Sequence, residues 1–239
     1  MSTVVAAIMC YLHNETEFIK ANRSLTEDMY ENRFCKSQNE ASTIESVLSK
    51  NKANINQWKL LAVVRDPVER FLSGFVDKCL LEQKRSNLPS RCYGCKNNMT
   101  CFLEKQLLRA HQKALGKKVS VTYEDVHFLP QNWHCKFNAY FGRYNVIKYR
   151  SEPGKGQKQM VDDIVRVLQK ANVSKSVSQF IVDELSSVRK TKHATSSSPE
   201  RAYYGDALRS NPYAMKLLVR LFYFDFILFG FPLPEVEPN

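Results

Sequence analysis

Residues 60–64 are five consecutive apolar residues, and Arg65, Asp66 and Pro67 follow them at once. An apolar run of this length without alternation is typical of a short β-strand buried on both faces, as in parallel sheets. Asp66 stands where a helix N-cap is expected, and Pro67 takes the first helical position, where its missing N–H is no loss. The sequence therefore predicts a strand, a turn and a helix that runs to about Gln83.

The predicted turn has the parts of an anion-binding site. The N-terminus of a helix offers unpaired backbone N–H groups and a positive dipole, and Arg65 stands at the junction of strand and helix. Its planar guanidinium can grip a phosphate in two places, and the Ser73 hydroxyl can donate one more hydrogen bond. An ordinary capped turn with a surface arginine uses the same residue types, so the pattern alone leaves both interpretations open.

The pattern Arg-Asp-Pro-x-x-Arg-x-x-Ser over residues 65–73 resembles the 3′-phosphate-binding motif of sulfotransferases, enzymes that use 3′-phosphoadenosine 5′-phosphosulfate (PAPS). Three later stretches resemble segments of the Golgi carbohydrate sulfotransferases of the chondroitin and HNK-1 type, particularly those of nematodes. They are residues 125–131 with Cys135, residues 192–195, and residues 223–230. The resemblance covers about residues 3–231.

This resemblance implies an α/β fold of the P-loop-like sulfotransferase kind. Such a fold has a small parallel sheet flanked by helices, and we expect the C-terminal half to be rich in helices. We expect one sulfotransferase-like domain over residues 1–231, followed by a disordered tail over residues 232–239 that contains three prolines.

The implied activity is transfer of a sulfuryl group from PAPS to a hydroxyl of a chondroitin-like glycan, on O4 of N-acetylgalactosamine. The implied partners are a glycosaminoglycan or proteoglycan acceptor and the nucleotide donor, with no metal and no nucleic acid. The implied location is the lumenal side of the Golgi membrane. The oligomeric state stays open.

The resemblance also implies roles for particular residues. Arg65 and Ser73 would grip the 3′-phosphate, Asp66 would fix the turn, and Arg70 would brace the site or touch the phosphate. The acceptor hydroxyl must lose a proton, and an imidazole can take it near neutral pH. The candidates for this base are His127 and His193, although a structural or surface histidine is the competing interpretation for each.

The sequence departs from the family at its start. Family members open their lumenal domain with a strand and a lysine-containing loop that holds the 5′-phosphosulfate, and no residue here matches that lysine. Residues 3–13 are instead expected to form the helix that follows this loop. We therefore expect either a truncated chain or a non-catalytic relative that binds nucleotide or glycan without turnover.

The charge points to an anionic partner. The chain has 35 Lys and Arg against 24 Asp and Glu, a net charge of +11 over 239 residues. The basic residues form no run and belong to no recognisable nucleic-acid-binding module, so a polysaccharide and a nucleotide phosphate fit better. A kinase is disfavoured because the sequence has no Gly-x-x-x-x-Gly-Lys-Ser/Thr loop.

Seven cysteines favour disulfides over a metal site. Cys92, Cys95 and Cys101 lie in a polar stretch, and the one nearby candidate for a fourth zinc ligand, His111, falls on the next expected helix. An odd number of cysteines leaves at least one outside any intrachain disulfide. Four Asn-x-Ser/Thr tripeptides agree with a secretory compartment: Asn14, Asn22, Asn98 and Asn172.

The remaining pattern is mostly helical. Strands are expected over residues 58–64 and 144–149, and residues 119–126 suit either a strand or a helix. Helices are expected over residues 3–13, 43–50, 67–83, 101–115, 157–170, 177–188 and 211–230. The last of these is strongly apolar, but charged residues interrupt it, so a packed core helix is favoured over a membrane span. Its Asp225 needs a partner, and a paired structural carboxylate is favoured over a catalytic one.

Overall fold

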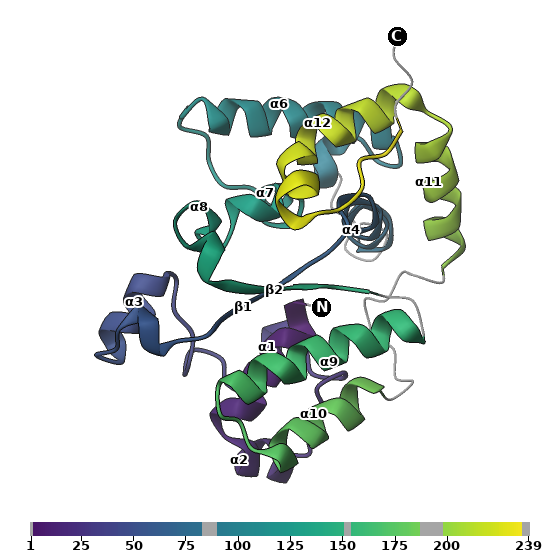
Figure 1. Cartoon of the computed structure of the whole chain (residues 1–239). Helices are drawn as coiled ribbons and strands as arrows, with labels where there is room; N and C mark the ends of the chain where they lie inside the picture. Colours follow the sequence, from purple (N-terminus) through teal and green to yellow (C-terminus); the bar gives the residue numbers. More distant parts are fainter. Residues whose placement is uncertain (1, 83–89, 151–153, 187–197, 236–239) are drawn as a thin grey trace. The chain divides into compact units, whose positions relative to one another are not determined.

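The computed structural model describes residues 2–82, 90–150, 154–186 and 198–235 (Figure 1). The chain divides into two compact units. Unit 1 comprises Met1–Val64 and Ala139–Lys192, and unit 2 comprises Arg65–Asn138 and His193–Asn239. Each unit is described by itself below. The expectation of one domain over residues 1–231 stays a prediction, and residues 236–239 of the expected tail lie outside the described residues.

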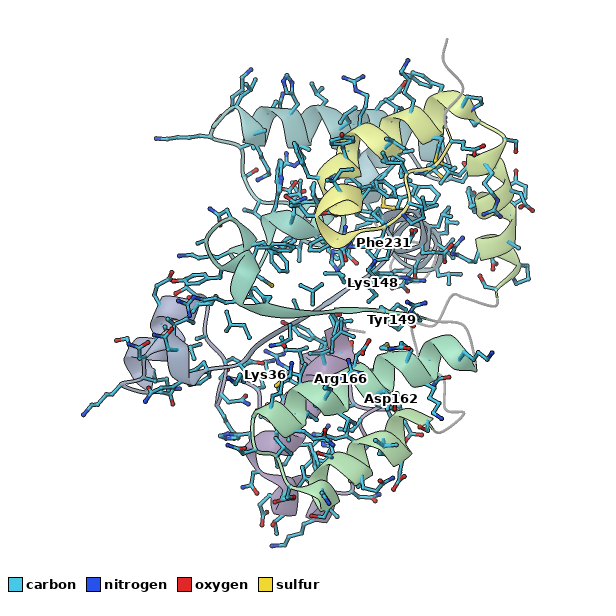
Figure 2. The ribbon with its side chains drawn as sticks, viewed as in Figure 1. Lys36, Lys148, Tyr149, Asp162, Arg166 and Phe231 are labelled. Atoms are coloured by element: carbon cyan, nitrogen blue, oxygen red, sulfur yellow. A yellow bond between two sulfur atoms is a disulfide. The ribbon has the colours of Figure 1, made fainter. Side chains whose placement is uncertain are left out.

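Unit 1 contains a pair of parallel strands, β1 (Leu60–Val64) and β2 (Tyr144–Lys148). They pair in register from Leu60 with Tyr144 to Val64 with Lys148. The Tyr149 backbone N–H extends the pairing by donating to the Val64 carbonyl at 2.6 Å, at the end of β2 that Figure 2 labels. The predicted parallel pairing is confirmed. β1 is less buried than predicted, because it has a single neighbouring strand in the described part of the chain and only Ala62 and Val64 are fully buried.

Helices make up most of the rest of unit 1. They are α1 (Ser2–His13), α2 (Glu15–Lys20), α3 (Ile44–Lys50), α9 (Lys155–Lys170) and α10 (Lys175–Ser186), with the 3-10 turns η1 (Tyr30–Asn32), η2 (Ile55–Gln57) and η6 (Phe141–Arg143). Helix α9 packs against β2. The apolar residues of α9 recur at helical spacing and face a core shared with α1 and α10. Tyr11 stacks on Phe180 there, with ring centroids 4.5 Å apart.

Unit 2 begins with the helix that follows β1. It contains α4 (Pro67–Gly74), η3 (Phe75–Leu81), η4 (Arg91–Gly94), α6 (Met99–Ala114), α7 (Tyr123–Phe128), η5 (Gln131–Trp133), the start of α8 (Phe137–Tyr140), α11 (Pro199–Arg209) and α12 (Pro212–Phe229). Figure 1 shows α6 and α12 lying side by side. Six phenylalanines fill the core between these helices: Phe71, Phe75, Phe102, Phe128, Phe222 and Phe226.

Two predicted elements of unit 2 need correction or completion, and one helix of unit 2 was not predicted. The helix expected over 67–83 is α-helical only to Gly74 and continues as the π-helix η3. The ambiguous segment 119–126 contributes to a helix, α7, because Thr122 and Asp125 form a reciprocal capping box at its start. Helix α11 was not predicted, although Ser198 caps it and Pro199 occupies its first turn.

Helix α12 is the apolar helix expected over 211–230. Asn211 caps its start, and Gly230 ends it in the left-handed conformation with φ 61°. It packs against α6, as predicted for a core helix. Among the described residues, no helix combines the length and apolarity needed to cross a bilayer.

Disulfides tie each unit internally. Cys10 is bonded to Cys35 in unit 1, and unit 2 contains the pairs Cys79–Cys92 and Cys95–Cys101. Cys135 takes part in none of the three bonds. The preference for disulfides over zinc is therefore confirmed, and no group of three His, Cys, Asp or Glu side chains in the described ranges could hold a metal.

Candidate functional site

The turn between β1 and α4 has the local geometry that the sequence predicts. The Asp66 carboxylate Oδ1 accepts a hydrogen bond from the Glu69 backbone N–H at 2.9 Å, and Pro67 occupies the first turn. Burial raises the pKa of the Asp66 carboxyl, while the hydrogen bond from Glu69 opposes that rise. Asp66 therefore fixes the start of α4, which is the role expected for it.

Gln131 holds the backbone of Arg65. Its Oε1 accepts the Arg65 backbone N–H at 2.9 Å, and its Nε2 donates to the Arg65 carbonyl at 2.8 Å. Both backbone polar groups of Arg65 are satisfied by one side-chain amide, although neither belongs to a helix or a strand. The amide thus fixes the backbone of Arg65.

Asp225 holds Gln131 in turn. Its carboxylate accepts hydrogen bonds from the Gln131 backbone N–H at 2.7 Å, the Asn132 backbone N–H at 2.8 Å and the Asn132 side-chain amide at 2.6 Å. Asp225 is fully buried, and charge-assisted bonds of this kind offset the cost of burying a carboxylate. The expectation of a paired structural carboxylate is confirmed.

The side chain of Arg65 shares a carboxylate with a second arginine. Glu69 Oε2 lies 2.6 Å from an Nη2 of Arg201 on α11 and 3.7 Å from Nη2 of Arg65. The Arg201 side chain is 9% exposed and that of Arg65 19%, whereas that of Glu69 is 45% exposed. Two guanidinium groups thus lie against one carboxylate beside the N-terminus of α4.

Ser73 lies one helical turn after Glu69. Residues four apart on an α-helix share a face, so Ser73 stands on the Glu69 side of α4. The structure therefore gathers Arg65, Glu69 and Arg201 in direct contact, with Ser73 on the adjoining turn.

Arg70 has other contacts. Its Nη2 donates to the His127 carbonyl at 2.9 Å, and its guanidinium carbon lies 5.9 Å from the centre of the Phe222 ring. Burial lowers the pKa of Arg70 to about 10, while the nearby Asp225 opposes that shift. Arg70 was expected either to brace the site or to touch the phosphate. These contacts with His127 and Phe222 suit the bracing role.

His127 lies on α7 with one ring nitrogen engaged. Its Nδ1 is 2.7 Å from the Tyr123 carbonyl, an acceptor, so Nδ1 carries the proton in the neutral ring and Nε2 carries the lone pair. Burial lowers the pKa of His127, and the Tyr123 carbonyl opposes that shift. The Tyr123 hydroxyl donates to Glu82, which fixes the turn that carries this histidine. His193, the other candidate base, lies outside the described residues.

Comparison with known proteins identifies the family. The model of a family described as the sulfotransferase family matches residues 1–232. The chain belongs to this sulfotransferase family.

Two nematode relatives support the assignment of this sulfotransferase-family chain. It is 34% identical over 237 residues, 98% of its length, to uncharacterized protein C18B2.2 of Caenorhabditis elegans. It is 33% identical over 233 residues, 97% of its length, to carbohydrate sulfotransferase chst-1 of the same organism. The chain spans 65% of the first relative's length and 70% of the second's. No solved structure matches it.

Sequence reasoning missed two residues that shape this site of the sulfotransferase-family chain, Gln131 and Arg201, and it left the partner of Asp225 open. Gln131 and Arg201 carried no signal of their own, because a glutamine after a proline and an arginine on a helix are both common surface patterns. Asp225 did carry one, since a lone carboxylate in an apolar helix requires a partner. The partner's identity needed the fold.

Proposed function

We propose that the chain is a carbohydrate sulfotransferase that transfers a sulfuryl group from PAPS to a hydroxyl of an acidic, chondroitin-like glycan. The proposed acceptor position is O4 of N-acetylgalactosamine, and the proposed location is the lumenal side of the Golgi membrane. The family assignment and the name of the relative chst-1 support the reaction class. Three disulfides support an oxidising compartment.

The observation that carries the proposal is the pair of arginines on Glu69. Two guanidinium groups face one half-exposed carboxylate beside the N-terminus of α4, so an added phosphate dianion would find both forks and the helix dipole. This combination suits the 3′-phosphate of the donor. A turn that only linked a strand to a helix would not need the second guanidinium.

PAPS supplies the activated sulfuryl group when it is bound. In this proposal Arg65 and Arg201 bind the 3′-phosphate, and Ser73 donates a further hydrogen bond to it. Asp66 and Gln131 hold the turn so that the Arg65 side chain starts from a fixed backbone. Such preorganisation favours the bound geometry without new contacts to the nucleotide.

His127 is the proposed base that takes the proton of the acceptor hydroxyl. Its Nδ1–H is held by the Tyr123 carbonyl, so the proton would be accepted at Nε2. Burial lowers the pKa of His127, which favours the neutral, proton-accepting form of the ring. His193 stays the alternative proposal for this role.

Transfer of radiolabelled sulfate tests the function. The purified chain is incubated with labelled PAPS and with chondroitin, heparan and keratan chains from which sulfate has been removed. Label on chondroitin supports the proposal, and disaccharide analysis then locates the sulfated oxygen. Binding of adenosine 3′,5′-bisphosphate without any transfer indicates the non-catalytic relative. A chain that shows neither binding nor transfer contradicts both.

A further inference from the structure

A basic cavity lies in unit 1, at the end of β1 where the strand begins. Its volume is about 440 Å³, within the range of small-ligand sites, and Trp58, Lys59, Arg143 and Lys170 are among its lining residues. Val64, which precedes the turn with the paired arginines, is at the other end of the same strand. The lining residues of the cavity all belong to unit 1, whereas Arg65, Glu69 and Arg201 belong to unit 2, so the two sites share no residue.

The cavity is strongly biased toward anions. Three of its lining residues are cationic and none is acidic. All three cationic residues are exposed, and within the described part of the chain Lys59 and Lys170 form no ion pair. An anion bound here would therefore meet positive charge without displacing a carboxylate.

The walls of the cavity are held by hydrogen bonds. Arg143 donates to the Asn56 side-chain carbonyl at 2.7 Å, and the Asn145 amide donates to the Leu60 carbonyl at 3.1 Å. The turn η2, which precedes Trp58, is closed by a capping box between Asn54 and Gln57. The indole and the charged groups are thus presented from fixed backbone positions.

Trp58 gives the cavity an aromatic face. Trp58 lies at the surface with 39% of the residue exposed. Covering its large apolar ring would remove that surface from water, which is energetically favourable. A pyranose ring has an apolar face that covers an indole, and its carboxylate and hydroxyl groups pair with ammonium, guanidinium and amide groups. A hexuronate-containing chain presents all of these together.

We propose that this cavity is a second binding site for an acidic oligosaccharide, with Trp58 stacking on a sugar ring and Lys59, Arg143 and Lys170 pairing with hexuronate carboxylates. The proposal rests on the proposed function for the identity of the ligand, and it adds a docking site apart from the site of transfer. Single-stranded nucleic acid could use the same groups. The disulfides favour the glycan, because they support an oxidising compartment, where glycans are more common than nucleic acids.

Calorimetric titration of the full chain with an unsulfated chondroitin decasaccharide tests this site. We expect Trp58→Ala to weaken binding about tenfold, as truncation of an aromatic anchor does, and Trp58→Phe to retain most of the affinity. We expect Lys59→Ala/Lys170→Ala to weaken binding about fivefold, with a smaller dependence on salt than the wild type.

The matched control is Arg166→Ala. Arg166, labelled in Figure 2, lies on α9, as Lys170 does. Its side chain is 60% exposed, but it already pairs with Asp163 at 2.9 Å. We expect this variant to bind the decasaccharide as the wild type does. Adenosine 3′,5′-bisphosphate should bind equally well to every variant, which separates this site from the arginine pair and also reports correct folding.

Each outcome decides the proposal. The proposal is overturned if Trp58→Ala and Lys59→Ala/Lys170→Ala both bind the decasaccharide as tightly as the wild type does. It is also overturned if the wild type binds a single-stranded DNA 12-mer more tightly than the decasaccharide. Loss of glycan binding in these variants supports the site even if no sulfate is transferred, so failure of the proposed reaction does not decide this question. If Arg166→Ala weakens glycan binding as much as these variants do, the binding reflects general charge attraction, and the proposal is also overturned.

Discussion

The side-chain amide of Gln131 bonds both the N–H and the carbonyl of Arg65. The two residues are 66 positions apart in the chain, and the Asp225 carboxylate holds the backbone of Gln131 from a third segment. The position of one arginine at the end of a strand thus depends on a hydrogen-bond chain that crosses unit 2. The predictions below test this chain and the charges that it positions.

Arg65→Ala should weaken binding of adenosine 3′,5′-bisphosphate about 10- to 100-fold, because a bidentate, charge-assisted contact is lost. Arg65→Lys should restore little, since an ammonium cannot replace the planar fork. Calorimetric titration measures both variants. Arg209→Ala is the control, because Arg209 is exposed and pairs with Asp206 on its own helix. Unchanged affinity in Arg65→Ala would reject the assignment.

Glu69→Gln should tighten binding of the same nucleotide about two- to fivefold at low salt. The wild-type carboxylate of Glu69 forms an ion pair with both guanidinium groups, and phosphate must compete with it. Half-exposed ion pairs contribute little free energy, so their loss should change the affinity by no more than a few-fold. Asp206→Asn removes one negative charge from the exposed surface of α11 and should change the affinity less. Weaker binding by Glu69→Gln would mean that the carboxylate positions the arginines and does not compete with phosphate.

Asp225→Asn should lower the free energy of unfolding by about 1–3 kcal/mol, because the amide nitrogen replaces one of two acceptor oxygens that face three donors. Urea unfolding measures the loss. Asp162→Asn, at an exposed position of α9, should leave the free energy of unfolding nearly unchanged. Equal stability of the two variants would show that the buried carboxylate is not a determinant of the fold.

His127→Gln should lower kcat by about 10²- to 10⁴-fold if Nε2 of His127 accepts the hydroxyl proton, with little change in the KM for PAPS. In the wild type, kcat/KM should fall on the acid side with a midpoint below the ordinary histidine pKa of 6.5, because burial lowers the pKa of this ring in the free chain. If the pH profile of His127→Gln still falls on the acid side with the same midpoint, the base is another group.

The same pKa direction affects stability. The unfolded chain binds a proton at His127 more readily than the folded chain does, so protonation favours unfolding. At pH values well above 6.5, His127 is neutral in both states and does not change the free energy of unfolding. As the pH falls below 6.5, protonation of His127 in the unfolded chain lowers the free energy of unfolding. His134, whose pKa burial also lowers, acts in the same direction. Melting temperatures should therefore fall less steeply with acid in His127→Gln than in the wild type.

Mass spectrometry of the secreted chain without reductant should find three linked pairs, Cys10–Cys35, Cys79–Cys92 and Cys95–Cys101. Iodoacetamide added to the denatured, unreduced chain should label Cys135 alone, because the other cysteines are oxidised. Cys135→Ser is the control and should take up no label. A peptide that links Cys92 to Cys95 would contradict the pairing in unit 2.

Local signals explain what the sequence could predict. The strand, Asp66, Pro67 and α4 follow from residues that are adjacent in the chain, and helix caps such as Asn211 mark other boundaries. The continuation of α4 as a π-helix over residues 75–81 has no comparable local signal in the sequence.

The contacts that complete the candidate site are long-range. Gln131 and Asp225 meet across 94 residues, and Arg201 reaches Glu69 from a helix that was not predicted. A residue's partner at such a distance depends on how the helices pack, which single-sequence patterns do not encode. Cys79 and Cys92 illustrate the same limit, since the sequence favoured disulfides but left their connectivity open.

The separation of 94 residues between Gln131 and Asp225 has a consequence for synthesis on the ribosome. Gln131 is translated 94 residues before its carboxylate partner, a delay of about 5–20 seconds at ordinary elongation rates. During that interval the nascent segment after β1 has no Asp225 to order it. The turn with the paired arginines therefore acquires its final form only after the last helix has emerged.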